Sequence, residues 1–296
     1  NYESHVVETG VKDGLFVRVA QGLQERNQAR RESIDMRVAK AAEIGEESLK
    51  LRLKNASPDD PETARYGYYS LGVWHGRAGN RKRATQLYQK AIKIQRAKLE
   101  HDDEQLMDTI WNLASSLDQE GETDKARPLF DEYFVLRRKK SGDIDADTFA
   151  ALQKICLLAQ RTGDPVDLVK AGNLVSEFYS AFKNARLTGK FEDQMLIELS
   201  NCLSTHSETL IEHEQWREAE KLVRDCIDLR EEVAAGTWML SISKLVLASS
   251  LSGQGKLDTA TELFASSYPE LEKRINQVSN GRDQLYWLKL ANQWRW

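Results

Sequence analysis

Histidines are the first candidates for chemistry, because an imidazole can bind a metal or carry a proton near neutral pH. His206 and His213 are seven residues apart, which places them two turns apart on one face of a helix. Helical zinc ligands usually lie four residues apart, and no cysteine has a suitable spacing from both histidines. The acidic run from His101 to Glu104 falls where a loop between helices is expected. We therefore predict no metal site.

Motifs for phosphate binding and for catalysis are absent from the sequence. There is no GxxxxGK[ST] loop, and the lone GxG from Gly253 to Gly255 fits a turn between helices. Kinase signatures such as HRD and DFG are missing, and no Ser/His/Asp or Cys/His set emerges from the spacing. We predict no catalytic residue and no cofactor. An enzyme with an unrecognised site stays open as the weakest alternative.

The charge balance argues against a nucleic-acid partner. Lysine and arginine number 42 against 46 acidic residues, for a net charge of −4. The basic runs Arg81–Arg83 and Arg137–Lys140 have acidic neighbours, so they fit a solvated surface better than a binding face.

The most apolar stretch, Leu240 to Leu251, is interrupted by Lys244 and is too short to span a membrane.

Cysteine usage and the first residue give expectations about the chain's context. Three cysteines without a CxxC motif indicate a reducing compartment, so we expect a cytoplasmic protein. The sequence begins with Asn1 and no basic and apolar leader follows. We therefore expect a fragment or a processed product.

One helical pattern recurs five times along the chain. It consists of an alanine followed by apolar or aromatic residues three and four positions later, a spacing that lies on one helix face. The alanines are Ala84, Ala126, Ala171, Ala219 and Ala260, separated by 42, 45, 48 and 41 residues. This regular period predicts an all-α, right-handed solenoid of antiparallel helix pairs.

A second pattern precedes these helices and indicates the first helix of each pair. It is a leucine followed by a small residue, with a glycine seven positions after the small residue. The sets are Leu71–Gly72 with Gly79, Leu113–Ala114 with Gly121, and Leu247–Ala248 with Gly255. They predict a close helix crossing followed by a tight turn. The fourth unit departs from the pattern, with His206–Ser207 and Glu214 at these places.

Together the two patterns resemble the tetratricopeptide repeat. The first unit follows that consensus at Tyr68, Leu71, Gly72, Gly79, Ala84, Tyr88 and Ala91. The period near 42 and the run Trp111–Ala114 are similar to the kinesin light chain variety. The segment Ser267–Arg274 resembles the carboxy-terminal repeat arrays of multidomain bacterial serine/threonine kinases. The resemblance implies a protein-binding array within a larger signalling protein.

The patterns divide the chain into three parts. Residues 1–60 form a helical lead-in, which can hold a degenerate capping repeat with its first helix within Val11–Arg37. Its second helix would carry Ala41, Ile44, Gly45, Ser48 and Leu51. Residues 61–277 hold about five repeats. Residues 278–296 are expected to form a capping helix, with Trp287, Trp294 and Trp296 on the exposed core edge.

The resemblance also implies a binding groove, because first helices line the concave face of such arrays. The implied groove residues are Tyr66, Tyr69, Arg77, Asp108, Trp111, Asn112, Ser115, Gln153 and Arg161. Aromatic rings beside amide and charged groups suit recognition of a peptide or a helix. It stays equally open that Tyr69 and Trp111 only pack between neighbouring units.

These expectations combine into one functional prediction. The chain is predicted to be a non-catalytic protein–protein interaction module that binds a partner peptide or helix in its groove. The alternative is a structural scaffold through which a larger signalling protein associates with itself, so a homo-oligomer stays open.

Overall fold

The computed structural model describes the backbone of residues 2–186 and 193–274, with side chains given within residues 28–184 and 195–273. In these residues eleven α-helices and one π-helix follow one another without a strand. The chain divides into two compact units, residues 1–129 and 130–296. Within the part of the chain that the structure describes, every helix is too short or too polar to span a bilayer.

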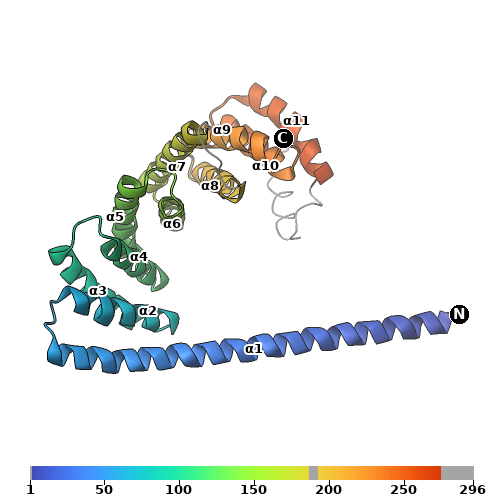
Figure 1. Cartoon of the computed structure of the whole chain (residues 1–296). Helices are drawn as coiled ribbons and strands as arrows, with labels where there is room; N and C mark the ends of the chain where they lie inside the picture. The colour runs from blue at the N-terminus through green and yellow to red at the C-terminus, as the bar shows by residue number, and fades with distance from the viewer. Residues whose placement is uncertain (1, 187–192, 275–296) are drawn as a thin grey trace. The chain divides into compact units, whose positions relative to one another are not determined.

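After the amino-terminal helix α1 (Tyr2–Asn55), the helices form five consecutive pairs, each with a first and a second helix (Figure 1). The pairs are η1 (Thr63–Tyr69) and α2 (Ser70–Arg77) with α3 (Arg81–Lys98); α4 (Glu104–Gln119) with α5 (Thr123–Ser141); α6 (Ala146–Thr162) with α7 (Pro165–Arg186); α8 (Asp193–Glu212) with α9 (Trp216–Val233); and α10 (Trp238–Gly253) with α11 (Leu257–Arg274). All five predicted alanines are buried on second helices. The predicted all-α array of helix pairs is confirmed.

The close crossing predicted at the small residue is present in the first pair. A Cβ atom added at Gly72 would lie only 2.6 Å from Cε1 of Tyr88 on α3. Only glycine therefore lets the ring of Tyr88 lie against the backbone of α2. Around this crossing, the buried cluster of the pair consists of Leu49, Ala64, Tyr68, Leu71, Leu87, Ala91 and Ile94.

The turn between the helices of a pair has the same geometry in regular units. Gly79 has φ of 77°, a left-handed conformation that glycine adopts without steric cost. The next amide, of Asn80, donates to the carbonyl of His75 at 2.8 Å and so closes a Schellman-type helix end. Gly121 and Gly255 have φ of 82° and 77°. The predicted glycine turns are confirmed.

The amino-terminal segment differs from its prediction, because α1 is one continuous helix from Tyr2 to Asn55. The expectation of a separate first helix within Val11–Arg37 is therefore wrong. The face of α1 that packs on the first pair is also shifted from the predicted stripe. Ala42 and Leu49 are buried, whereas Ile44, Ser48 and Leu51 are exposed.

Contacts with η1, α2 and α3 explain this choice of face. A Cβ atom at Gly45 would lie 2.7 Å from Cδ1 of Leu71, so α1 approaches α2 closely there. Beside this contact, Glu46 lies 3.0 Å from Nε2 of His75 and accepts a hydrogen bond of 2.8 Å from Nε of Arg83. The bonds from Arg83 lower the pKa of Glu46. Side-chain packing and this ion pair hold the end of α1 against both helices of the first pair.

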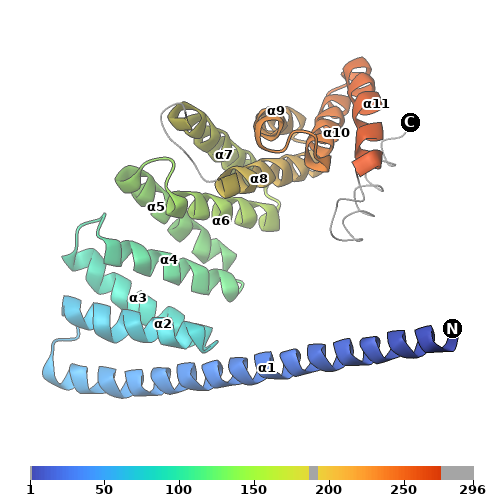
Figure 2. The ribbon, with the colours of Figure 1, turned by 45° about the vertical axis from the view of Figure 1, so that its right-hand side comes forward.

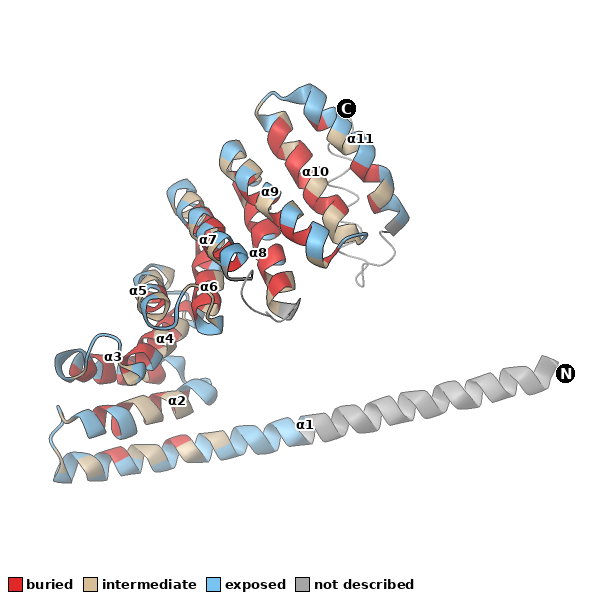
Figure 3. Ribbon diagram, turned by 45° about the horizontal axis from the view of Figure 1, so that its top comes forward, coloured by how far each residue is buried: buried red, intermediate tan, exposed pale blue. Residues whose placement is uncertain are grey.

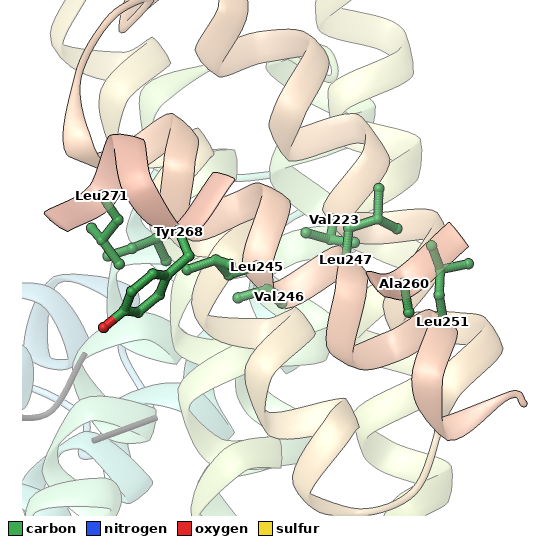
Figure 4. Packing of buried hydrophobic residues seen from close by; sticks show 9 residues of the cluster. Val223, Leu245, Val246, Leu247, Leu251, Ala260, Tyr268 and Leu271 are labelled. Atoms are coloured by element: carbon green, nitrogen blue, oxygen red, sulfur yellow. The ribbon is translucent and has the colours of Figure 1, made fainter. Parts of the chain in front are cut away.

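In the second unit, α10 packs on both α9 and α11 and is mostly buried (Figure 3). Because α10 has a neighbour on either side, apolar residues occur nearly all round it. Their cluster with α9 and α11 includes Val223, Ile242, Leu245, Val246, Leu247, Leu251, Ala260, Tyr268 and Leu271 (Figure 4). The predicted capping helix 278–296 and its tryptophans lie outside the described residues.

A buried polar network joins the fourth pair to α10 of the fifth pair. The guanidinium of Arg230 donates to Oγ of Ser243 at 2.7 Å and to the carbonyl of Met239 at 2.8 Å. It also donates to Oγ of Ser204, which in turn donates to Glu208 at 3.0 Å. Burial raises the pKa of Glu208 to about 7. The fourth pair therefore contains a buried arginine, Arg230, and a half-buried glutamate, Glu208, joined through the hydroxyl of Ser204.

Candidate protein-binding site

Two predicted groove residues meet between consecutive first helices of the first unit. Tyr69 ends η1 and is half-buried. Nδ2 of Asn112 on α4 donates a hydrogen bond of 3.3 Å to the hydroxyl oxygen of Tyr69. The same Nδ2 donates to the backbone carbonyl of Asp108 at 2.8 Å, which fixes the orientation of the amide. Tyr69, Asn112 and Asp108 therefore form one polar and aromatic cluster on η1 and α4.

The cluster also contains Tyr88, whose ring lies 6.0 Å from that of Tyr69 at a tilt of 50°. Burial raises the pKa of Tyr69, and the charge of Asp108 raises it further. Burial likewise raises the pKa of Tyr88. Both phenols are therefore protonated at neutral pH. While accepting from Asn112, the hydroxyl of Tyr69 can donate its own proton to a ligand oxygen.

Arg77 supplies positive charge near these phenols. Its side chain is exposed, and its guanidinium lies 5.3 Å from the ring centre of Trp74. The charge of Arg77 lowers the pKa of Tyr69, in opposition to burial. The hydroxyl of Tyr69 thus interacts electrostatically with both a cation and the carboxylate of Asp108, which suits polar groups of a bound segment.

Tyr66 lies in a neighbouring cationic patch with α1. Its ring is 49% exposed. The guanidinium of Arg65 lies 5.0 Å from the ring centre, and that of Arg52 on α1 lies 5.8 Å away. Tyr66 therefore contacts the α1 side of the first pair, whereas Tyr69 contacts α4.

The other predicted groove residues lie on α4 and α6. Trp111 and Ser115 on α4 are half-buried. On α6, in the second unit, Gln153 is half-buried and Arg161 is exposed. That these four residues line a common groove with Tyr69 stays a prediction.

Sequence reasoning missed two features of the site. The first is the π-helix η1, which carries Tyr66 and Tyr69; at its end the backbone amide of Ser70 donates to the carbonyl of Arg65, five residues back. Such turns are frequent at functional sites, and no sequence pattern marked this one. The second is Tyr88, which matches the repeat consensus but was not among the predicted groove residues. Its aromatic type was the available signal.

His206 and Cys156 are buried packing residues, whereas His101 is exposed. His206 is buried with Nε2 2.6 Å from the carbonyl of Leu168, and burial lowers its pKa. A hydrogen bond with Cys202 and burial raise the pKa of Cys156, which makes its thiol a poor nucleophile. Among the described residues, no group of three or more His, Cys, Asp or Glu side chains could hold a metal ion.

Comparison with known proteins agrees with the helix pairs. Residues 68–104 match the tetratricopeptide repeat family. No curated protein matches the sequence.

Several solved structures are similar to the chain. One is a kinesin light chain from Podospora anserina with nearly identical TPR-like repeats, at 16% identity and a TM-score of 0.47, covering 72% of this chain and 97% of that one. BtubC (BKLC) from P. vanneervenii has 15% identity and a TM-score of 0.46, covering 80% of this chain and 90% of that one. MamA protein has 12% identity and a TM-score of 0.45, covering 74% of this chain and 97% of that one.

The fold and the matched repeat define the class. The chain is a tetratricopeptide-type array of consecutive helix pairs, with one repeat matched over residues 68–104. Repeats of this type typically mediate protein–protein interactions and are typically non-catalytic.

Proposed function

We propose that this chain is a non-catalytic module that binds a peptide or helix of a partner protein against the first helices of its first two pairs. The observation that carries the proposal is the hydrogen bond between Tyr69 and Asn112, which joins an aromatic ring and an amide from consecutive first helices. A bound segment would place apolar side chains on the tyrosine ring and backbone or acidic groups on the amide and Arg77.

The cluster of Tyr69 and Asn112 should bind a partner segment at low entropic cost, because its side chains are already ordered. The amide of Asn112 is fixed at both Tyr69 and Asp108, so binding orders few further protein groups. A tyrosine offers a large contact area for the loss of few rotatable bonds. Tyr69 and Trp111 occupy the same repeat position, 42 residues apart, and we propose both as anchors.

The test compares partners recovered from a cell lysate by the wild-type chain and by Tyr69→Ala/Trp111→Ala. The matched control is Val166→Ala, which truncates an exposed apolar side chain on α7. Each protein is first shown by circular dichroism to be equally folded. An anchor pair should contribute at least about 2 kcal/mol, roughly thirtyfold in affinity. If the folded double variant keeps its partners at unchanged affinity, the site assignment is overturned.

Two further parts of the proposal concern context. We propose that the array serves a larger signalling protein, such as a serine/threonine kinase, on the basis of the sequence Ser267–Arg274 alone. Reading the gene upstream of the codon for Asn1 tests this, because an in-frame HRD and DFG pair would support it and a complete upstream sequence without one would contradict it.

We also propose a cytoplasmic location, which imaging of the tagged natural protein tests.

A further inference from the structure

The amino-terminal helix α1 has the pattern of a second helix, but among the described residues no separate first helix packs beside it. With an offset of 43 residues, Ile44, Ser48 and Leu51 correspond to Leu87, Ala91 and Ile94 on α3. The three α3 residues are buried in the cluster that also contains Tyr68 and Leu71 of their own first helix. On α1, Ile44 is 55% exposed and Leu51 is 58% exposed.

The 43-residue offset between α1 and α3 also accounts for the opposite face of α1, which packs on the following first helix. Ala42 corresponds to Thr85, whose hydroxyl donates to Oγ of Ser116 on the next first helix at 2.8 Å. In the same way, the face of α1 that includes Ala42 packs on the next first helix, through Leu49. The face with Ile44 and Leu51 therefore lies where a first helix normally packs.

This exposed face continues along α1 as a coiled-coil seam. Ile34, Arg37, Ala41, Ile44, Ser48 and Leu51 are spaced alternately by three and four residues. That spacing is the a and d pattern of a helix that packs against another helix along its length. Ile34 is 49% exposed as well. Beyond the first pair, α1 runs on as a long helix (Figure 2), and packing rather than intrinsic propensity stabilises most helices.

We propose that this seam pairs in antiparallel orientation with the seam of a second copy of the chain. In the symmetric register, Ile34 of each copy faces Leu51 of the other and Ala41 faces Ile44. Arg37 faces the small hydroxyl of Ser48, and its apolar stem lies along the seam. A parallel pair would instead place Arg37 against Arg37, with like charges in contact.

Charges beside the seam support the antiparallel register. Lys40 and Glu47 both lie on the seam's g positions, and in this register Glu47 of the other copy is the g residue nearest in level to Lys40. The symmetry forms this pair twice. Both side chains are exposed on α1, where Lys40 pairs with Glu43 at 2.7 Å.

The proposal goes beyond the groove function and uses residues remote from Tyr69 and Asn112. Each copy contributes only six seam positions, from Ile34 to Leu51, so the interface is small and the dimer is expected to be weak, with a dissociation constant of about micromolar order. A dimer would present two arrays at once and so bind a bivalent partner with increased avidity.

Sedimentation velocity of the full 296-residue chain over about 1 to 200 µM tests the dimer. The wild type is expected to shift from monomer to dimer with concentration. Ile44→Glu/Leu51→Glu should stay monomeric, because each dimer would bury four carboxylates in the seam. The control Val166→Glu places the same charge at an exposed apolar site on α7 and should leave the dimer intact. A monomeric wild type at all concentrations, or a double variant that still dimerises, overturns the proposal.

Charge exchange tests the register. Lys40→Glu and Glu47→Lys each create like charges across the interface twice and should weaken the dimer at least fivefold at low salt. The double variant Lys40→Glu/Glu47→Lys restores opposite charges and should recover wild-type dimerisation. If the single variants do not weaken the dimer, or the double variant is as weak as the single ones, the antiparallel register is wrong.

Discussion

The first and fourth helix pairs reach the same geometry from different residues. The first pair has Gly72 at its crossing and Gly79 at its turn, as the repeat pattern requires. The fourth pair has His206–Ser207 and Glu214 at these places. Nevertheless, its turn closes with the same bond, from the amide of Gln215 to the carbonyl of Leu210 at 2.8 Å. Backbone hydrogen bonds and the buried alanine therefore define a helix pair more strongly than the first-helix consensus does.

The neighbouring helix α7 explains how the fourth pair accommodates a histidine. Nε2 of His206 lies 2.6 Å from the carbonyl of Leu168. A Cβ atom at Gly172 would lie 3.3 Å from Cδ2 of His206 and 3.0 Å from Cδ1 of Leu222. Here the small residue is on the preceding second helix, and the larger ring packs against it. The fourth pair thus stays closely packed although its small residue lies on the neighbouring helix.

The largest expected effect tests the feature that both pairs share. Ala84 and Ala219 are fully buried on their second helices. Ala84→Leu and Ala219→Leu should each overpack the crossing and lower the free energy of unfolding by up to about 3 kcal/mol. Ala265→Leu, at an exposed position of α11, is the control and should have almost no effect. Urea denaturation measures all three, and an unchanged midpoint for Ala219→Leu alone would mean that the fourth pair packs differently.

The second-largest expected effect on stability concerns Glu208 in the polar network of the fourth pair. Burial raises the pKa of Glu208 to about 7, whereas the unfolded carboxyl titrates near its usual value of about 4.5. Between these values the folded state binds more protons than the unfolded state, so this group's contribution to stability falls as the pH rises. Glu208→Gln should therefore be more stable than the wild type at pH 8, by about 2 kcal/mol, with a smaller difference at pH 5. Thermal unfolding at both pH values measures this. If the stability difference between Glu208→Gln and the wild type is the same at pH 5 and pH 8, Glu208 does not titrate between these pH values.

Much of the fold was predictable because it rests on local spacing. Each of the five alanines and each glycine turn marks a contact between the two helices of one pair. These contacts recur along the chain at a nearly constant period. The continuity of α1 was not predictable in this way. Its Ala41–Leu51 stripe matches a second helix, while the adjacent residues Ala42 and Leu49 are also apolar. Contacts with the first pair, such as that of Gly45 with Leu71, decide which stripe is buried.

The candidate site was predictable in its residue types and less so in its contacts. Family geometry placed Tyr69 and Asn112 on consecutive first helices, and the structure joins them. Tyr66, assigned to the same wall, instead contacts Arg52 of α1. Which way each tyrosine points depends on the π-helix η1, and that turn has no signature in the sequence.

The smallest expected effect concerns the turn. Glu214 has φ of 60°, the left-handed conformation that costs a residue with a Cβ atom about 1 kcal/mol. Glu214→Gly should remove this cost and raise the free energy of unfolding by somewhat under 1 kcal/mol, since glycine also gains freedom in the unfolded chain. In the first pair, Gly79→Ala should lower stability by about 1 kcal/mol, because an added Cβ meets no atom within 4 Å and only the backbone conformation opposes it.

The control for this prediction is Glu214→Ala, which removes the carboxylate but keeps a Cβ atom at the same φ. It should leave the urea midpoint nearly unchanged, so a gain seen with glycine and not with alanine assigns the cost to the backbone. If both variants stabilise the chain equally, repulsion by the carboxylate explains the effect instead. If neither does, the fourth pair holds its turn without strain, and the glycine of the repeat pattern is dispensable wherever the bond equivalent to Gln215–Leu210 forms.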